Sequence, residues 1–366
     1  MEEEIINLIK KHEKYRHEAI NLIPSENRLS NSVLKALSSD LASRYGTEWY
    51  GGSKYSMEIY EKAVELAKKL FKARHALISI SGNLCDLAAI FSFTNPYDEI
   101  AVIPKENGGY PLGYEKFDRK TFKIPMKEYE VDVDKLEKRK FPLILIASSI
   151  ILFPLPIKEI ASFYDGIIVY DASHVLGLIA GGEFQQPLKE GAHIIIGSTH
   201  KTLPGPQGGV ILTNDDALYE KMKKYILFDF EKGIGLIDNM HMNGIAALAI
   251  SFEEMLKNGK EYARQIVKNA KTLASFLHEN GIPVKYKERG YTQSHQILLD
   301  LDENERFRIF KILENNRIFI DKIGRIGVAE VTHIGMKEKE TEEIGEMIVE
   351  AYKGKDVREK AIKMAR

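Results

Sequence analysis

The fold is decided by the stretch His193-Ile-Ile-Ile-Gly-Ser-Thr-His-Lys-Thr-Leu-Pro-Gly-Pro-Gln-Gly-Gly209. Its three consecutive isoleucines are β-branched and apolar, which predicts a short buried strand that ends near Lys201. Two prolines and three glycines follow this lysine and predict a sharp turn before another strand over 209–213. A lysine at a strand end, beside residues that let another group approach closely, suits the amine of a Schiff base. The alternative interpretation is a surface lysine in a loop.

A second strand pattern ends in a carboxylate: Gly166-Ile-Ile-Val-Tyr-Asp171, followed by Ala172-Ser173-His174. Two buried strands that each present polar residues at the carboxyl end predict an open α/β sheet, and ligands of such sheets bind outside those strand ends. Asp171 is placed to keep a pyridinium nitrogen protonated, as pyridoxal phosphate sites require. His174 is placed to stack on the ring or to orient it, with a purely structural histidine as the alternative.

These two segments resemble the core of the serine hydroxymethyltransferase family. The resemblance rests on Asp171-Ala-Ser-His-Val-Leu-Gly-Leu-Ile-Ala-Gly and on Ser198-Thr-His-Lys-Thr-Leu-Pro-Gly-Pro-Gln-Gly-Gly, in the same order and at the same spacing as in the family. It implies an α/β protein of fold type I, a pyridoxal-phosphate-dependent transferase. It also implies that Ser198, His200 and Lys201 lie at the cofactor, with Lys201 forming the Schiff base.

The composition sets the broad class. A chain of 366 residues with 44% hydrophobic and 29% charged residues is typical of a soluble globular protein. Its net charge of -1 points to neither a nucleic acid nor a membrane surface as partner. No run is long enough to span a bilayer, and residues 1–20 lack the apolar core of a signal peptide. The single cysteine, Cys85, excludes an intrachain disulfide and favours a reducing compartment, most simply the cytoplasm.

The pattern of elements predicts three parts: a helical arm over 1–20, a large cofactor-binding domain over 21–260, and a small α+β domain over 261–366. Strands and helices alternate between residues 75 and 213, which favours right-handed crossovers and a mostly parallel mixed sheet flanked by helices. Near the boundary we expect two separate helices, over 242–256 and 261–280. In fold-type I enzymes such an arm often reaches a second subunit. The resemblance therefore implies a homodimer with active sites at the subunit interface.

Three further segments carry expected cofactor contacts. Ser81-Gly82-Asn83 follows a predicted strand and opens a helix, which makes either an anion cradle or an ordinary helix cap. The family has Ser-Gly-Ser here and binds the cofactor phosphate with it. Tyr110 stands where the family has a histidine stacked on the ring; its aromatic face can still stack, but it does not titrate near neutral pH. A predicted strand over 142–149 ends in Ser148 and Ser149, and one of the two is expected near the phenolic oxygen of the cofactor.

The stretch over 44–55 resembles the family's tyrosine-rich loop, with several residues missing. Tyr50 matches a tyrosine near the cofactor and substrate, and Tyr45 matches one that reaches the phosphate of the partner subunit. Glu48 takes the place of a glutamate that assists proton transfer at the substrate hydroxyl.

The substrate carboxylate is expected between two other segments. Asn21-Leu-Ile-Pro-Ser-Glu-Asn27 is similar to the family's Leu-Ile-Ala-Ser-Glu-Asn, whose serine contacts this carboxylate, so Ser25 takes that role; a helix-capping turn is the alternative. Residues 325–332 are similar to Arg-(Val/Leu/Ile)-Gly-Thr-Pro-Ala-(Leu/Ile/Val)-Thr. Arg325 matches the arginine that binds the carboxylate, a task that suits its planar fork, with a structural salt bridge as the alternative. The long Asn/Pro-rich loop that precedes this arginine in the family, and helps to hold folate, is cut to a few residues.

Together these residues predict a pyridoxal-phosphate enzyme that acts at Cα of a small amino acid. The first hypothesis is interconversion of serine and glycine, with tetrahydrofolate or tetrahydromethanopterin as the one-carbon carrier. The second is a pterin-independent reaction of a β-hydroxy-amino-acid aldolase, an aminotransferase or a racemase. The third is a catalytically idle binding or scaffold relative, which the joint presence of Lys201, Asp171, His174 and Arg325 disfavours. No metal site is expected.

Overall fold

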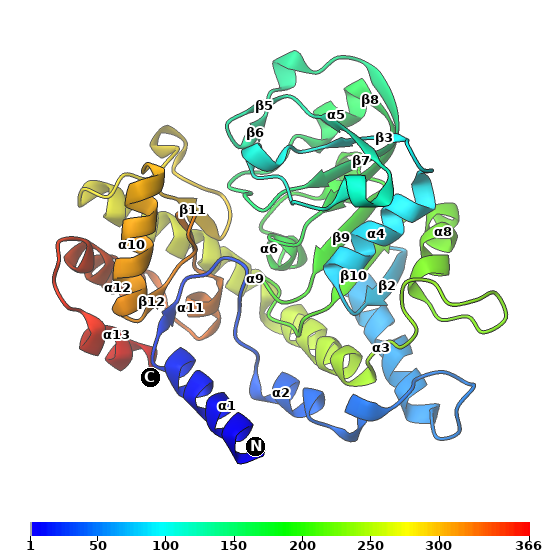
Figure 1. The fold of residues 1–366 in the computed structure, drawn as a ribbon, viewed down its shortest axis with the longest axis horizontal. Coiled ribbons are helices and arrows are strands. Elements are labelled where there is room, and N and C mark those ends of the chain that lie inside the picture. The colour runs from blue at the N-terminus through cyan, green and yellow to red at the C-terminus, as the bar shows by residue number, and fades with distance from the viewer. Residues whose placement is uncertain (1) are drawn as a thin grey trace. The chain divides into compact units, whose positions relative to one another are not determined.

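The computed structural model describes residues 2–366, which Figure 1 shows as a ribbon. The chain divides into two compact units. One is Leu29–Glu261, and the other joins the residues up to Arg28 with Tyr262–Arg366. The N-terminal segment thus belongs to the same unit as the C-terminal third of the chain.

The unit Leu29–Glu261 is built on a seven-stranded sheet with the strand order β2-β10-β9-β8-β7-β3-β4. Its strands are β2 (His75–Ser79), β3 (Glu99–Val102), β4 (Lys120–Lys123), β7 (Arg139–Ala147), β8 (Tyr164–Asp171), β9 (Ile194–Ser198) and β10 (Gly209–Thr213). Strand β10 runs antiparallel to both of its neighbours, whereas the other neighbouring strands are parallel. The mostly parallel mixed sheet confirms the expected α/β fold class. A separate hairpin pairs β5 (Met126–Lys127) with β6 (Glu130–Val131).

Helices alternate with these strands. The α-helices are α2 (Asn31–Leu37), α3 (Lys54–Phe71), α4 (Gly82–Phe93), α5 (Ile157–Phe163), α6 (Leu176–Ala180), α7 (Pro187–Glu190) and α8 (Asp216–Ile226). Short 3₁₀ helices are η1 (Asp40–Ser43), η2 (Lys105–Asn107), η3 (Tyr114–Phe117) and η4 (Val133–Lys135). Because β3, β4, β7, β8 and β9 are parallel to one another, their carboxyl ends lie at the same edge of the sheet.

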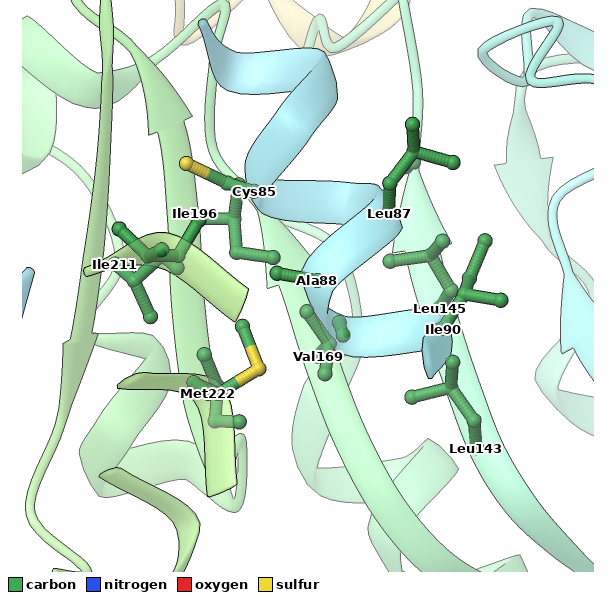
Figure 2. Packing of buried hydrophobic residues seen from close by; sticks show 14 of the residues in the cluster. Cys85, Leu87, Ala88, Ile90, Leu143, Leu145, Val169, Ile196, Ile211 and Met222 are labelled. Carbon is green, nitrogen blue, oxygen red and sulfur yellow. The ribbon is translucent and has the colours of Figure 1, made fainter. Parts of the chain in front are cut away.

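The core of this unit lies between α4 and the central strands. Figure 2 shows Cys85 and Ala88 of α4 among Val169, Ile196 and Ile211 of the sheet. These side chains are almost fully buried, and each large aliphatic side chain buried in this way contributes about 1.5–3 kcal/mol. Packing along α4 therefore fixes the start of this helix beside β9 and β10, where the candidate site begins.

The other unit contains two small sheets. Strand β1 (Ile20–Asn21) pairs in parallel with β12 (Ile318–Phe319), and β11 (Gln296–Leu298) pairs antiparallel with β13 (Arg325–Gly327). Its helices are α1 (Glu2–His17), α10 (Glu303–Asn315), α11 (Ala329–His333), α12 (Glu338–Tyr352), α13 (Arg358–Ala365) and the 3₁₀ helix η5 (Lys287–Arg289). The C-terminus lies beside the end of α1, because the Arg366 guanidinium donates to Glu18 Oε1 at 2.6 Å.

The expectation of two helices near the unit boundary is wrong. One continuous helix, α9, spans Met242–Glu279, and the boundary between the units falls within it. Gly259 lies between the two expected helices, yet a glycine inside a helix costs only about 1 kcal/mol relative to alanine. Buried apolar residues on both sides of it, Phe252 and Ala263, supply the packing that sustains the helix. Within residues 2–366, no helix combines the length and apolar character that a bilayer crossing requires.

Candidate active site

The Asp171 carboxylate is held in place by a chain of hydrogen bonds. Asp171 is the last residue of β8 and is 6% exposed. Its Oδ1 accepts hydrogen bonds from the backbone N–H of Ser173, at 2.8 Å, and from the hydroxyl of the same serine. The Ser173 hydroxyl in turn accepts from the backbone N–H of Ser198, at 2.8 Å, at the end of β9. The carboxylate is therefore held rigidly at the carboxyl edge of the sheet.

The chain beyond Asp171 is tied to the segment that carries Lys201. The backbone N–H of Ala172 donates to Ile196 O at 2.7 Å, so β8 and β9 stay together beyond their last paired residues. The Thr202 hydroxyl donates to the backbone carbonyl of His174 at 2.9 Å. Lys201 itself is half-buried, whereas His174 is buried. The residues expected from the two sequence motifs thus come together.

The turn after Lys201 is closed by its own backbone. The Gly205 N–H donates to Thr199 O at 2.9 Å, and the Thr199 hydroxyl donates to Pro206 O at 2.7 Å. A Cβ atom at Gly205 would lie 2.6 Å from Thr199 O, closer than two such atoms can approach. The glycine is therefore required for the turn that presents the lysine.

Two titratable groups accompany the lysine, the half-buried His200 and the buried Asp86. Burial, together with the charge of Lys201, lowers the pKa of His200 to about 4. On α4, Asp86 is 2% exposed, and its Oδ1 accepts no hydrogen bond from the described residues. Burial and then the charge of Asp171 raise the pKa of Asp86 well above its ordinary range, while Lys201 acts in the opposite direction. Asp86, Asp171 and Lys201 therefore share one electrostatic environment.

The start of α4 forms a cradle beside these groups. Ser81 is the N-cap of the helix and Gly82 its first residue. A Cβ atom at Gly82 would lie 2.4 Å from Ser198 Oγ, so only glycine lets the helix start approach β9 this closely. The first backbone N–H groups of a helix are unpaired and favour an anion such as a phosphate.

Tyr110 joins this cradle. Its hydroxyl donates to Asn83 Oδ1 at 3.2 Å, and its backbone N–H donates to Ala147 O at 3.0 Å, at the end of β7. Burial, followed by the charges of Asp86 and Asp171, raises the pKa of Tyr110. At neutral pH the ring is therefore a neutral aromatic surface near the carboxylates.

The two serines at the end of β7 differ in their surroundings. The Ser148 hydroxyl is buried and lies 2.8 Å from Ile150 O, to which it donates. It also accepts from the backbone N–H of Ile150 at 3.1 Å. Ser149 is partly exposed, and its backbone N–H donates to Gly108 O at 2.7 Å. The Ser148 hydroxyl is thus used by its own turn.

The tyrosine-rich loop forms a separate aromatic cluster. Tyr45 and Tyr50 stack with ring centroids 4.5 Å apart, and Trp49 lies 4.5 Å from the ring of Phe230. All four rings are substantially exposed, between 36% and 59%, and Glu48 is exposed in the same loop. The hydrogen bonds of the loop's tyrosine carbonyls are local, from Ser56 to Tyr45 and from Ser53 to Tyr50.

Ser25 and Arg325 lie in the other compact unit. The backbone N–H of Gly327 donates to Leu22 O at 2.8 Å, which ties the segment of Ser25 to the strand of Arg325. The side chain of Arg325 is 12% exposed, and its Nε donates to Asp321 Oδ2 at 2.7 Å. The backbone N–H of Arg325 also donates to Asp321, at Oδ1. The salt bridge that was the alternative interpretation is therefore present.

Sequence reasoning missed three of these contributors: Ser173, Thr202 and Asp86. The first two are small hydroxyl residues inside recognised motifs, and only the fold shows which atoms they join. Asp86 had a visible signal, because it is the one charged residue in the apolar run Leu84–Ile90 of α4. An acid on the buried side of a helix is uncommon unless the acid has a function or a partner.

The donor set fits pyridoxal phosphate. It offers a lysine amine, a buried carboxylate for the ring nitrogen, an aromatic ring, and a helix start shaped for a phosphate. The α/β fold with a lysine after β9 and an aspartate at the end of β8 defines a pyridoxal-phosphate-dependent enzyme of fold type I. A solved structure of an L-threonine transaldolase from Pseudomonas fluorescens has the same fold, with a TM-score of 0.88 and 27% sequence identity over 99% of this chain and 90% of that chain.

The family follows from the sequence relatives. The model of the serine hydroxymethyltransferase family matches residues 1–348. The chain is 38% identical to the serine hydroxymethyltransferase of Methanothermobacter thermautotrophicus, over 98% of this chain and 92% of the relative. It is 39% identical to that of Archaeoglobus fulgidus, over 96% and 87%. The chain belongs to the serine hydroxymethyltransferase family and is a serine hydroxymethyltransferase-like, pyridoxal-phosphate-dependent transferase.

Proposed function

We propose that this enzyme interconverts serine and glycine and passes the one-carbon unit to a tetrahydropterin. The observation that carries the proposal is the arrangement of Asp171 and Lys201, whose strands are neighbours and whose segments are joined by hydrogen bonds. When bound, pyridoxal phosphate supplies an electron sink for the bond that breaks at Cα of an amino acid. Lys201 is the amine that carries the cofactor and afterwards the base that moves a proton at Cα.

Asp171 holds a proton on the ring nitrogen. Its carboxylate is buried and accepts from two donors of Ser173, which fix its orientation. His174, on the same segment, would orient the ring, and Tyr110 would offer it an aromatic face. A neutral His200 lies beside Lys201 and therefore adds no positive charge next to the amine.

The cofactor phosphate is assigned to the start of α4, with Ser81, Gly82 and Asn83 as its donors. Ser198 lies against Gly82 and closes the cradle from the side of β9. For the phenolic oxygen of the cofactor we assign Ser149 rather than Ser148, because the Ser148 hydroxyl donates to the backbone of its own turn.

Arg325 and Ser25 are assigned to the α-carboxylate of the amino acid. A guanidinium that is anchored through Nε to Asp321 is pre-oriented for such a ligand. Holding the substrate in one orientation decides which bond at Cα lies perpendicular to the ring, and such positioning supplies on the order of 7–11 kcal/mol of barrier reduction. Tyr50 and Glu48 are assigned to the substrate side chain, with Glu48 moving the proton of its hydroxyl.

A homodimer with shared active sites is part of the proposal. It is supported by exposed apolar surface, since monomers rarely leave large apolar patches uncovered. The aromatic cluster of Tyr45, Trp49, Tyr50 and Phe230 is one such surface. On α1, four apolar side chains are 45–59% exposed: Ile5, Ile6, Leu8 and Ile9. We assign Tyr45 to the phosphate of the partner subunit, and the reducing cytoplasm as the compartment.

A second candidate function is a pterin-independent reaction on a β-hydroxy amino acid. The favouring observation is the short connection between β12 and β13, residues 320–324, where the family's folate-holding loop is expected. The related fold of an L-threonine transaldolase is consistent with this candidate.

One experiment separates the two candidates. The purified protein, loaded with pyridoxal phosphate, is given serine with tetrahydrofolate, with tetrahydromethanopterin, or with no pterin, and glycine is measured. The proposal predicts that glycine forms at a rate that rises with one of the two pterins. Cleavage of threonine or phenylserine without any pterin, combined with serine turnover that no pterin accelerates, would support the second candidate instead.

A further inference from the structure

A buried acid acts as a brace: it is hydrogen-bonded to both ends of the segment 21–28, which carries Ser25. Glu330, in the first turn of α11, is 8% exposed. Its Oε2 accepts from Asn21 Nδ2 at 2.6 Å, and its Oε1 accepts from the Arg28 guanidinium at 3.3 Å. These partners stand at opposite ends of the segment 21–28, with Ser25 between them. One carboxylate thus holds both ends of this loop.

The loop is also held by contacts that do not involve Glu330. Pro24 O lies 3.1 Å from Nε2 of His295, and Arg28 O lies 2.9 Å from Nδ1 of His333. A Cβ atom at Gly327 would lie 2.5 Å from the Cα of Pro24, so the loop packs directly against β13. Removal of Glu330 therefore leaves the loop attached but without the charged contacts that fix its two ends.

The charge of Glu330 needs an explanation, because a buried acid costs free energy unless it is paired. Arg28 supplies the countercharge, and the Asn21 amide supplies a second donor. Both hydrogen bonds of this acid go to the loop rather than to solvent.

We propose that Glu330 is a positioning residue for substrate binding, which fixes Ser25 against the strand that carries Arg325. This inference rests on the proposed function, in which Ser25 and Arg325 bind the α-carboxylate of the amino acid. A loop held at both ends keeps the serine hydroxyl at one distance from the arginine. A loop without these two side-chain bonds keeps its backbone contacts but samples more distances between them, and so binds the carboxylate less tightly, although the chemistry at Lys201 is unchanged.

The test uses two variants of the cofactor-loaded full-length enzyme. Glu330→Ala removes the brace. Arg28→Met combined with Glu330→Met replaces the ion pair of the buried Glu330 and the partly exposed Arg28 by apolar side chains, which is expected to preserve folding stability. In both variants we expect KM for the amino acid to rise about tenfold, as for the loss of a hydrogen bond to a charged group, with kcat within about twofold of wild type. The absorbance spectrum of the bound cofactor is expected to stay unchanged.

The matched control is Glu350→Ala. This residue lies in α12 of the same unit and pairs with Lys355 and Lys360, away from the loop. It is expected to leave KM at the wild-type value. Glu330→Gln keeps an acceptor without the charge and is expected to give an intermediate KM.

Amide hydrogen exchange tests the brace independently of turnover. Peptides that cover 21–28 are expected to exchange faster in both brace variants than in wild type, and at the wild-type rate in the control. A folded brace variant with wild-type KM, or with unchanged exchange in this loop, overturns the inference. Failure of the wild-type enzyme to act on any amino acid refutes the proposed function instead, and the exchange measurement still decides whether Glu330 braces the loop.

Discussion

The cofactor side of this enzyme and its substrate side differ in how far they depart from the family pattern. Around Asp171 and Lys201 both motifs are intact; Ser173 joins Asp171 to Ser198, and Thr202 joins the lysine segment to the carbonyl of His174. Around Arg325 the preceding loop is short, and two acids hold the segments: Asp321 pairs with Arg325, and Glu330 is hydrogen-bonded to both ends of the segment of Ser25. The comparison teaches that hydroxyl groups position the residues on the proposed cofactor side, whereas charged groups position those on the proposed substrate side.

The largest loss of activity is expected for Lys201→Ala, on the cofactor side. Activity is expected to fall by at least about a thousandfold, because the amine is lost both as the cofactor's attachment point and as the base. The measurement is amino-acid turnover with saturating pyridoxal phosphate. Arg325→Lys serves as the contrasting variant on the substrate side, and it is expected to raise KM while the cofactor stays attached. Substantial turnover by the alanine variant would contradict the account.

Asp171→Asn tests the electron sink without changing the shape of the site. Loss of the negative charge at the ring nitrogen is expected to lower kcat on the order of 100-fold or more, as for other lost electrostatic contacts in active sites. Cofactor affinity, measured by fluorescence titration of the apoprotein, is expected to fall much less, because the phosphate cradle of α4 remains. A kcat close to wild type in this variant would remove Asp171 from the mechanism.

Asp321→Asn sharpens the substrate side. The guanidinium of Arg325 loses its charged partner at Nε and is no longer pre-oriented. We therefore expect KM for the amino acid to rise about tenfold, with kcat nearly constant. Asp40→Asn is the matched control, because Asp40 pairs with Arg44 on an exposed surface. An Asp321 variant that loses kcat instead of affinity would place this residue on the cofactor side.

The last prediction concerns the dependence of stability on pH. The folded pKa of His200 is about 4, below its unfolded value of 6.5, so the neutral form is favoured in the folded state. Its stabilising contribution is therefore present above pH 6.5 and is lost as the pH falls through 6.5 toward 4, by at most about 1.4 kcal/mol per pH unit. Urea unfolding of the apoprotein at pH 7.0 and 4.5 measures it. His200→Gln is expected to reduce this loss; parallel pH dependences of variant and wild type would contradict it.

Most of the fold could be predicted because its strands are short apolar runs with clear ends. The strand before Lys201 and the strand that ends in Asp171 were visible as apolar runs followed by polar residues. Both are confirmed as strands of one sheet. The continuous helix α9 was not predicted, because the buried contacts that sustain it on both sides of Gly259 depend on the fold and are not visible in the sequence.

The site could be predicted only as a set of residue types. The sequence shows a serine and a lysine in a motif but not that Ser173 holds Asp171 or that Thr202 reaches the carbonyl of His174. Those contacts join residues more than twenty positions apart or depend on side-chain orientation. The braces at Asp321 and Glu330 were missed for a related reason: a charged residue near a motif resembles any surface charge until its burial is known.

The central claim is that Lys201 carries the cofactor beside the carboxylate of Asp171. The most direct measurement is borohydride reduction of the cofactor-loaded enzyme, followed by peptide mapping by mass spectrometry. The account predicts that the reduced cofactor is found on the peptide that contains Lys201, and that the Lys201→Ala variant yields no labelled peptide. Label on a different lysine, or no label in wild type, would contradict it.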